Sequence, residues 1–254
     1  MQEKDEPQEN ALSVNRLHSY DQLNEVCRRN NRIAPKPLEG NHLPSHRYIK
    51  ERRMKKFIDY LKTEYAPLAI VTYGSFNNGS NDETSDFDCL IIVDKKCQKH
   101  DATRIDGTPL DCFIYTKEEV AHETIETFLT LFDGNIIYDT DGVAAALKQR
   151  VKAYVFEHTV TPNDEKQWII DWIRKTMHRA EKNDDEGNYR AIAFLEESLN
   201  DYCLLRDRFY FGSKKALAFL KENDACGYRL YHQALLERTN AAIRKWADYV
   251  IQIH

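Results

Sequence analysis

The chain has 254 residues, which is enough for one large domain or two moderate ones, each with its own core. Its net charge of −5 creates no general field for binding polyanions, so nucleic acid is not favoured as a partner. The six cysteines form neither a CxxC pair nor a compact framework, which argues against a disulfide scaffold and against a zinc site.

The amino-terminal segment differs in composition from a targeting signal. Its first ten residues, MQEKDEPQEN, are acidic and polar, whereas a signal peptide begins basic and continues apolar. No stretch approaches the roughly 20 apolar residues of a membrane span. We therefore expect a soluble, cytoplasmic protein with reduced thiols and no membrane association.

Residues 1–45 are predicted to form a weakly organised arm, to which we assign no chemistry. The first ten are expected to be disordered, and residues 11–29 to form a short helix. Prolines and a glycine between positions 35 and 44 then interrupt any regular element.

An amphipathic helix is predicted over residues 46–64, with Ser45 as its cap. Its apolar side chains share one side, and basic side chains at positions 47–56 lie elsewhere on the helix. A basic helix can contact nucleic acid, but a solvated helix face explains the same pattern. A buried strand over residues 68–73 follows the helix.

The stretch of residues 71–94, VTYGSFNNGSNDETSDFDCLIIVD, carries the strongest functional signal. Gly74 and Ser75 end the first strand at a point where a ligand can approach the backbone closely. Asp86 and Asp88 open the next strand two residues apart, so both side chains project from the same side of the sheet. Two carboxylates that close are hard to keep ionised without a cation. The stretch therefore predicts a nucleoside triphosphate held through a divalent metal.

A third strand is predicted over residues 110–115, after a tight hairpin turn at Asp106 and Gly107. It carries Asp111 among apolar neighbours, where an unpaired buried charge costs several kcal/mol. An edge-strand aspartate that faces solvent is one interpretation. Beside a strand that bears Asp86 and Asp88, the metal-site interpretation is preferred, because three carboxylates can hold two Mg²⁺ ions about 3.5 to 4 Å apart.

These residues, in this order, resemble the nucleotidyltransferase superfamily that includes DNA polymerase beta. They resemble more closely its aminoglycoside and lincosamide (kanamycin-type) branch. The resemblance covers roughly residues 48–145, and Glu118, Glu119 and the stretch NIIYDTDG at 135–142 are similar to the end of the family's catalytic domain. It implies two Mg²⁺ ions at Asp86, Asp88 and Asp111, and triphosphate contacts at Gly74 and Ser75.

The carboxyl-terminal half shows only helical periods from Thr161 onward. Helices are expected around residues 168–177, over 189–209, after Ser213, and over 228–253. Short loops between such helices predict antiparallel packing in a bundle.

The expected fold is therefore α+β. A nucleotidyltransferase domain with a small mixed sheet, covered by helices on one face, is followed by an all-α helical bundle. The predicted division is an arm at 1–45, a catalytic domain at 46–160 and a helical substrate-binding domain at 161–254.

The long helix of the second half carries a narrow charged stripe that includes Glu197 and Asp201, one turn apart. Such a stripe can line a cleft or face water. The sequence LNDY at 199–202 resembles the family segment that carries the general base, which implies that role for Asp201, with Glu197 as the other candidate. Related enzymes place a lysine on the triphosphate, and Lys214, after a predicted capping serine, is assigned to it here, although lysines in such positions are more often simply solvated.

The resemblance implies an Mg²⁺-dependent enzyme that moves a nucleoside monophosphate onto a small-molecule hydroxyl and releases pyrophosphate. The expected donor is ATP or another nucleoside triphosphate, and the expected acceptor is an aminoglycoside-type antibiotic, which implies antibiotic resistance. A homodimer is a further expectation. Two alternatives stay open: transfer to a protein or RNA acceptor, and a catalytically inactive nucleotide-binding module.

Overall fold

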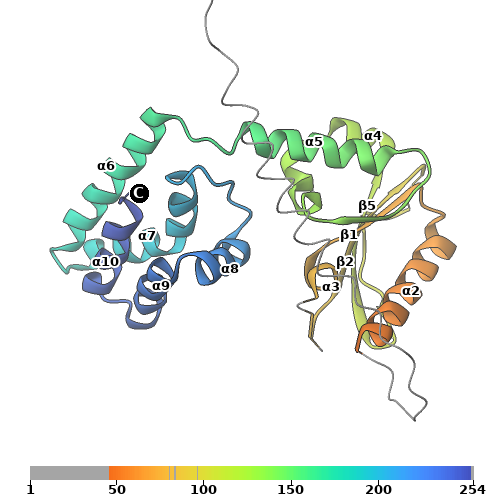
Figure 1. Ribbon diagram of the computed structural model, residues 1–254, viewed down its shortest axis with the longest axis horizontal. Helices are drawn as coiled ribbons and strands as arrows, with labels where there is room; N and C mark the ends of the chain where they lie inside the picture. The colour runs from red at the N-terminus through yellow and green to blue at the C-terminus, as the bar shows by residue number, and fades with distance from the viewer. Residues whose placement is uncertain (1–45, 80, 83, 96, 253–254) are drawn as a thin grey trace, which may run out of the picture. The chain divides into compact units, whose positions relative to one another are not determined.

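The computed structural model describes residues 46–79, 81–82, 84–95 and 97–252 (Figure 1). The chain divides into two units, Met1–Ile49 and Lys50–His254, and nearly all described residues belong to the second. The expectations for residues 1–45, including the short helix and the cap at Ser45, lie outside the described residues.

The two halves of the described chain differ in kind. The first half contains α2 (His46–Tyr65), β1 (Ala69–Thr72), α3 (Gly74–Asn78), β2 (Phe87–Val93), β3 (His100–Asp101), β4 (Arg104–Ile105), β5 (Thr108–Thr116), α4 (Lys117–His122), the 3₁₀ helix η1 (Ile125–Leu131), β6 (Asn135–Asp139) and α5 (Val143–Glu157). The second half contains α6 (Asn163–Ala180), α7 (Asp185–Leu204), α8 (Ser213–Asn223), α9 (Ala225–Glu237) and α10 (Asn240–Val250). This confirms the α+β fold class, with a helical carboxyl-terminal part.

The sheet is small and mixed, as predicted. Its strands follow the order β3-β5-β2-β1-β6, and β4 pairs with β5 outside this path. Strands β2 and β5 run parallel to each other, whereas β1 runs antiparallel to β2 and to β6. Of the seven residues of β2 only Asp88 is not fully buried, because this apolar strand lies inside the sheet.

Helices cover both faces of the sheet, so the expectation of helices on one face was wrong (Figure 1). Phe57 and Leu61 of α2 pack on the face that carries Phe87 and Ile91. The opposite face packs against the side chains of α4, η1 and α5. The sequence showed α2 clearly, but the apolar positions of α5 belong to a segment for which no helix was predicted.

The hairpin between β4 and β5 forms at the predicted turn. Asp106 and Gly107 have φ angles of 51° and 83°, the left-handed values that a two-residue hairpin turn of this kind requires. Asp106 also forms an ion pair with Lys56 of α2.

A buried carboxylate joins α2 to the sheet edge. Asp101 of β3 is 4% exposed and accepts hydrogen bonds from Tyr60 Oη at 3.0 Å, Tyr65 Oη at 2.7 Å and the Thr103 amide at 2.9 Å. Burial alone would raise the pKa of Asp101, but these hydrogen bonds favour the charged form and together lower it.

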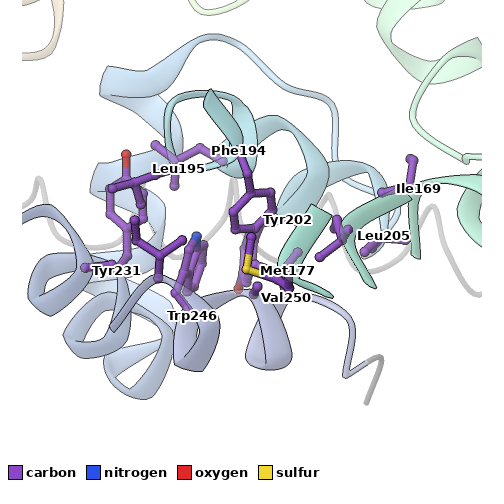
Figure 2. Packing of buried hydrophobic residues seen from close by; sticks show 14 of the residues in the cluster. Ile169, Met177, Phe194, Leu195, Tyr202, Leu205, Tyr231, Trp246 and Val250 are labelled. Carbon is purple, nitrogen blue, oxygen red and sulfur yellow. The ribbon is translucent and has the colours of Figure 1, made fainter. Parts of the chain in front are cut away.

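The helical part has its own core, in which Trp246 of α10 is fully buried (Figure 2). Its ring centroid lies 5.7 Å from that of Tyr202 in α7 and 5.2 Å from that of Tyr231 in α9. Its indole N–H donates to Ser198 Oγ at 2.8 Å, so the polar edge of the ring is satisfied inside the apolar core.

The ends of two predicted helices differ from the expectation. The single helix expected over 228–253 is two helices, because Arg238 adopts a left-handed φ of 52° and Thr239 caps α10 through the Ala242 amide. The long helix α7 begins earlier than predicted, where Asp184 accepts from the Gly187 amide, and it ends at Leu204. Trp168, in the first of the predicted helices of this half, is 67% exposed.

None of the helices in the described residues is both long enough and apolar enough to traverse a bilayer.

Replacing Asp101 by asparagine is expected to lower the free energy of unfolding near pH 7 by about 1 to 3 kcal/mol, because a charged acceptor of three hydrogen bonds becomes neutral. Since the folded pKa is lowered, this stability is present above the unfolded pKa and is lost as the pH falls through the folded pKa. Urea unfolding at neutral and acidic pH measures the difference. Asp248→Asn, on the exposed side of α10, is the control, and an equal loss in both variants would contradict the assignment.

Candidate active site

Two predicted carboxylates lie side by side on neighbouring strands. Asp88 of β2 and Asp111 of β5 are register partners in the parallel pair. Asp86 lies one residue before β2 begins, and its side chain is exposed. The structure therefore places Asp88 beside Asp111, whereas Asp86 belongs to the entry of the strand and not to the strand itself.

The pKa of Asp88 is raised by its surroundings. Partial burial is the largest cause, followed by the negative charges of Asp111 and Asp86. Lys214 and the Ser75 backbone N–H act in the opposite direction, since a positive charge and a hydrogen bond both stabilise the carboxylate. Asp88 therefore experiences the negative charge of both neighbouring carboxylates, and a cation beside it would offset that repulsion.

Gly74 leaves room for the Asp88 carboxylate. A Cβ atom at position 74 would lie 2.0 Å from Asp88 Oδ2, and the φ of Gly74 is +69°. Both the space and the backbone conformation therefore require glycine. The sequence predicted a ligand-accepting turn here; in the structure Gly74 opens the short helix α3, and the turn also holds the catalytic carboxylate candidate.

His100 contacts Asp111, although nothing in the sequence had indicated a role for it. Its Nε2 lies 2.6 Å from Asp111 Oδ1, and because a carboxylate only accepts, the imidazole nitrogen is the donor. His100 also lies against Phe113, with ring centroids 4.9 Å apart. Pairing of β3 with β5 brings His100 to Asp111, and only the strand pairing could have revealed it.

Lys214 belongs to the same electrostatic environment as Asp88, since its charge lowers the pKa of that carboxyl group. It is the second residue of α8. Gly212, with a φ of 95°, occupies the cap position, so the expectation that Ser213 caps the helix was wrong. The neighbouring Lys215 pairs instead with Asp133.

Asp201 and Glu197 differ sharply in environment. Asp201 is 9% exposed, and its Oδ2 atom has no hydrogen-bond partner among the described residues, whereas Glu197 is exposed. Burial, followed by the charge of Glu197, raises the pKa of Asp201 to about 6. The two carboxyl groups therefore have different charged neighbours. Glu197 acts on Asp201, whereas Asp111, Asp86 and Lys214 act on Asp88.

The donor set at Asp86, Asp88 and Asp111 fits a hard divalent cation such as Mg²⁺, because such ions prefer carboxylate oxygens. The mutual repulsion felt by Asp88 supports this fit. In the described part of the chain, no group of three or more His, Cys, Asp or Glu side chains already stands close enough to enclose an ion.

A family model described as a nucleotidyltransferase domain matches residues 54–198, which is more than half of the chain. The chain belongs to the nucleotidyltransferase domain family. The match includes both carboxylate strands and extends into α7, and the protein is accordingly a nucleotidyltransferase.

The other comparisons add little to this family assignment. No curated protein matches the chain. A crystal structure of a nucleotidyltransferase-like protein from Exiguobacterium sibiricum is similar over 80% of this chain and 74% of its own, at 13% identity and a TM-score of 0.35. Similarity of that degree does not bear on activity.

Replacing Gly74 by alanine is expected to cost about 2 to 5 kcal/mol of unfolding free energy, since it adds a steric clash with Asp88 to a left-handed backbone conformation. Gly142→Ala is the matched control: its φ is +73°, but nothing lies within 4 Å of an added Cβ. That variant should lose only about 1 to 2 kcal/mol. Urea unfolding compares the two, and equal losses would show that Asp88 does not occupy the space beside Gly74.

Replacing Asp201 by asparagine is expected to stabilise the protein at pH 8 by about 1 to 3 kcal/mol. Because the pKa of Asp201 is raised in the folded state, the wild-type protein is most stable below the pKa that this group has in the unfolded chain. It loses stability as the pH rises through about 6 and the buried carboxyl group ionises. Wild type and variant should therefore converge near pH 4. Urea unfolding across this range measures the effect, with exposed Glu196→Gln as the control. A variant that is less stable at every pH would refute the buried-carboxylate interpretation.

Proposed function

We propose that the protein transfers a nucleoside monophosphate, most simply AMP from ATP, to a hydroxyl group of a small molecule and releases pyrophosphate. The observation that carries this proposal is the placement of Asp88 and Asp111 as register partners, with the charge of Lys214 acting on Asp88. Family membership supports nucleotidyl transfer in general, and the nature of the acceptor is our inference from the site.

In this proposal Asp86, Asp88 and Asp111 hold two Mg²⁺ ions. Bound Mg²⁺ would neutralise charge on the triphosphate and on the attacking oxygen. The chain's own part would be to stabilise the charged carboxylates: the Ser75 amide stabilises Asp88, and His100 donates a hydrogen bond to Asp111. Most of the acceleration would then come from positioning and charge neutralisation.

Lys214, Gly74 and Ser75 are proposed to contact the β and γ phosphates. Gly74 is exposed and has no side chain, so a phosphate can approach its backbone. Lys214 is exposed near Asp88 and offers a point charge to the phosphate that leaves. Residues 46–160 would form the catalytic domain and residues 161–254 the acceptor-binding domain.

The general base is proposed to be Asp201, with Glu197 as the alternative. The acceptor oxygen attacks the α-phosphorus, the bond from that phosphorus to the oxygen of the β-phosphate breaks, and the hydroxyl proton passes to the carboxylate. A pKa of about 6 suits this task, because the group is mostly deprotonated at neutral pH and still accepts a proton. An unpartnered oxygen on a buried side chain is also expected of a group that acts on a ligand.

A cationic acceptor of the aminoglycoside type is the proposed substrate class. Asp201 and Glu197 place two acidic groups one helical turn apart, and amino groups on the acceptor would complement them. This would make the protein a kanamycin-type enzyme that inactivates an antibiotic. The alternative RNA acceptor has less support, because Lys56 on the basic side of α2 is already paired with Asp106.

Incubation with radiolabelled nucleoside triphosphates, Mg²⁺ and a panel of aminoglycosides, lincosamides and short RNAs tests the proposal. Wild type should move label to a small cationic acceptor, and Asp88→Asn should reduce the rate by at least about 100-fold, since it removes charge that offsets the metal ions. Asp201→Asn and Glu197→Gln are assayed in parallel, and the variant with the greater loss identifies the base.

Asp94→Asn serves as the control, because Asp94 is exposed directly after β2 and is not part of the proposed site. Equal transfer by wild type and Asp88→Asn would show that the metal-site assignment is wrong. Label that moves to RNA or to the protein itself would replace the small-molecule acceptor with the alternative one.

A further inference from the structure

The loop between η1 and β6 contacts the start of α8. Lys215 Nζ lies 2.9 Å from Asp133 Oδ1, and these two residues are 82 positions apart in the sequence. Lys215 directly follows Lys214, the residue whose charge acts on Asp88. The ion pair therefore fixes a point on α8 immediately beside the proposed triphosphate lysine.

Aromatic rings from the two segments, one from each, reinforce this contact. The ring centroids of Phe132 and Phe211 lie 4.8 Å apart, and Lys215 Nζ lies 4.9 Å from the Phe211 centroid. The same two segments thus meet through an ion pair and a ring pair, and Phe211 and Lys215 flank Lys214 in sequence. A ring pair at this separation adds to the stabilisation that comes from burial of apolar area.

The loop is itself attached to the segment that opens with Gly74. Asn77 of α3 donates from Nδ2 to the Asp133 carbonyl at 2.9 Å and accepts from Asn135 Nδ2 at 2.6 Å. Gly134 lies so close to β1 that an added Cβ would be 3.1 Å from the Thr72 carbonyl oxygen. The position of Asp133 is therefore determined by the same short helix that follows the Gly74 and Ser75 turn.

We propose that Asp133 is a positioning residue, which holds Lys215 and thereby sets Lys214 over the Asp88 carboxylate and the triphosphate. This inference rests on the proposed function of Lys214. An ion pair whose side chains are 58% and 43% exposed adds little to stability. Its effect lies in geometry, because the loop that carries Asp133 holds both groups that are proposed to contact the phosphates. It holds the Gly74 and Ser75 turn through Asn77, and it holds Lys214 through Lys215.

The test compares four variants of the full-length chain. Asp133→Asn and Lys214→Gln are made singly and as a double variant, and a fourth variant exchanges the two charges of the ion pair, Asp133→Lys with Lys215→Asp. Asp106→Asn is the matched control, because it breaks the exposed ion pair with Lys56 away from the site. Calorimetric titration with a nonhydrolysable ATP analogue and Mg²⁺ measures affinity. Hydrogen exchange of residues 211–223, without nucleotide, measures how firmly the start of α8 is held.

Asp133→Asn should weaken binding of the analogue by about tenfold, as expected for one displaced charge-assisted contact, with little change in melting temperature. The exchanged pair should recover most of the affinity. The combined variant should bind no more weakly than Lys214→Gln, because Asp133 acts only through that lysine. Asp133→Asn should also speed exchange in residues 211–223 several-fold, and Asp106→Asn should change neither quantity.

Multiplicative losses in the combined variant, or unchanged affinity in Asp133→Asn, would overturn the proposal. If wild type binds no nucleoside triphosphate, the proposed function fails, and the exchange measurement decides the remaining claim on its own. Unchanged exchange in Asp133→Asn would then show that this residue does not hold α8, whereas faster exchange confined to residues 211–223 would support it.

Discussion

The pairing of Asp88 with Asp111 on adjacent parallel strands is the constraint on which the rest of the site depends. Two carboxylates in register at the centre of a sheet repel each other, and this repulsion adds to burial, the larger cause, in raising the pKa of Asp88. The surrounding residues offset it from several directions: the Ser75 amide and Lys214 stabilise Asp88, and His100 contacts Asp111. A site that tolerates such repulsion is suited to divalent cations and polyphosphate.

The two halves of the chain carry different kinds of acidic group. The carboxylates on the sheet are close to one another and only partly buried, which suits ligation of a cation. Asp201, in contrast, is almost fully buried in a helix, and one of its oxygens has no hydrogen-bond partner in the described part of the chain, which suits the proposed proton transfer. Environment, and not residue type, therefore separates the two proposed roles.

Local patterns in the sequence predicted much of the sheet and the core of the site. The apolar run over residues 87–93 and the small residues at 74 and 75 are local features, and the turn at Asp106 and Gly107 is determined by its own two residues. His100 and Asp133 were missed, because their importance arises from partners 11 and 82 positions away. The break at Arg238 was missed as well, since periodicity continues across it.

The parallel pairing of β2 with β5 also has a consequence for how the protein acquires its activity. A parallel pair cannot close through a tight turn, and here the connection between the two strands contains β3 and β4, which both pair with β5. Non-local strand pairing of this type forms slowly compared with helices. Asp88 and Asp111 therefore become neighbours only when the sheet is assembled, so recovery of catalytic competence during refolding should report completion of the sheet and not the earlier appearance of helical structure.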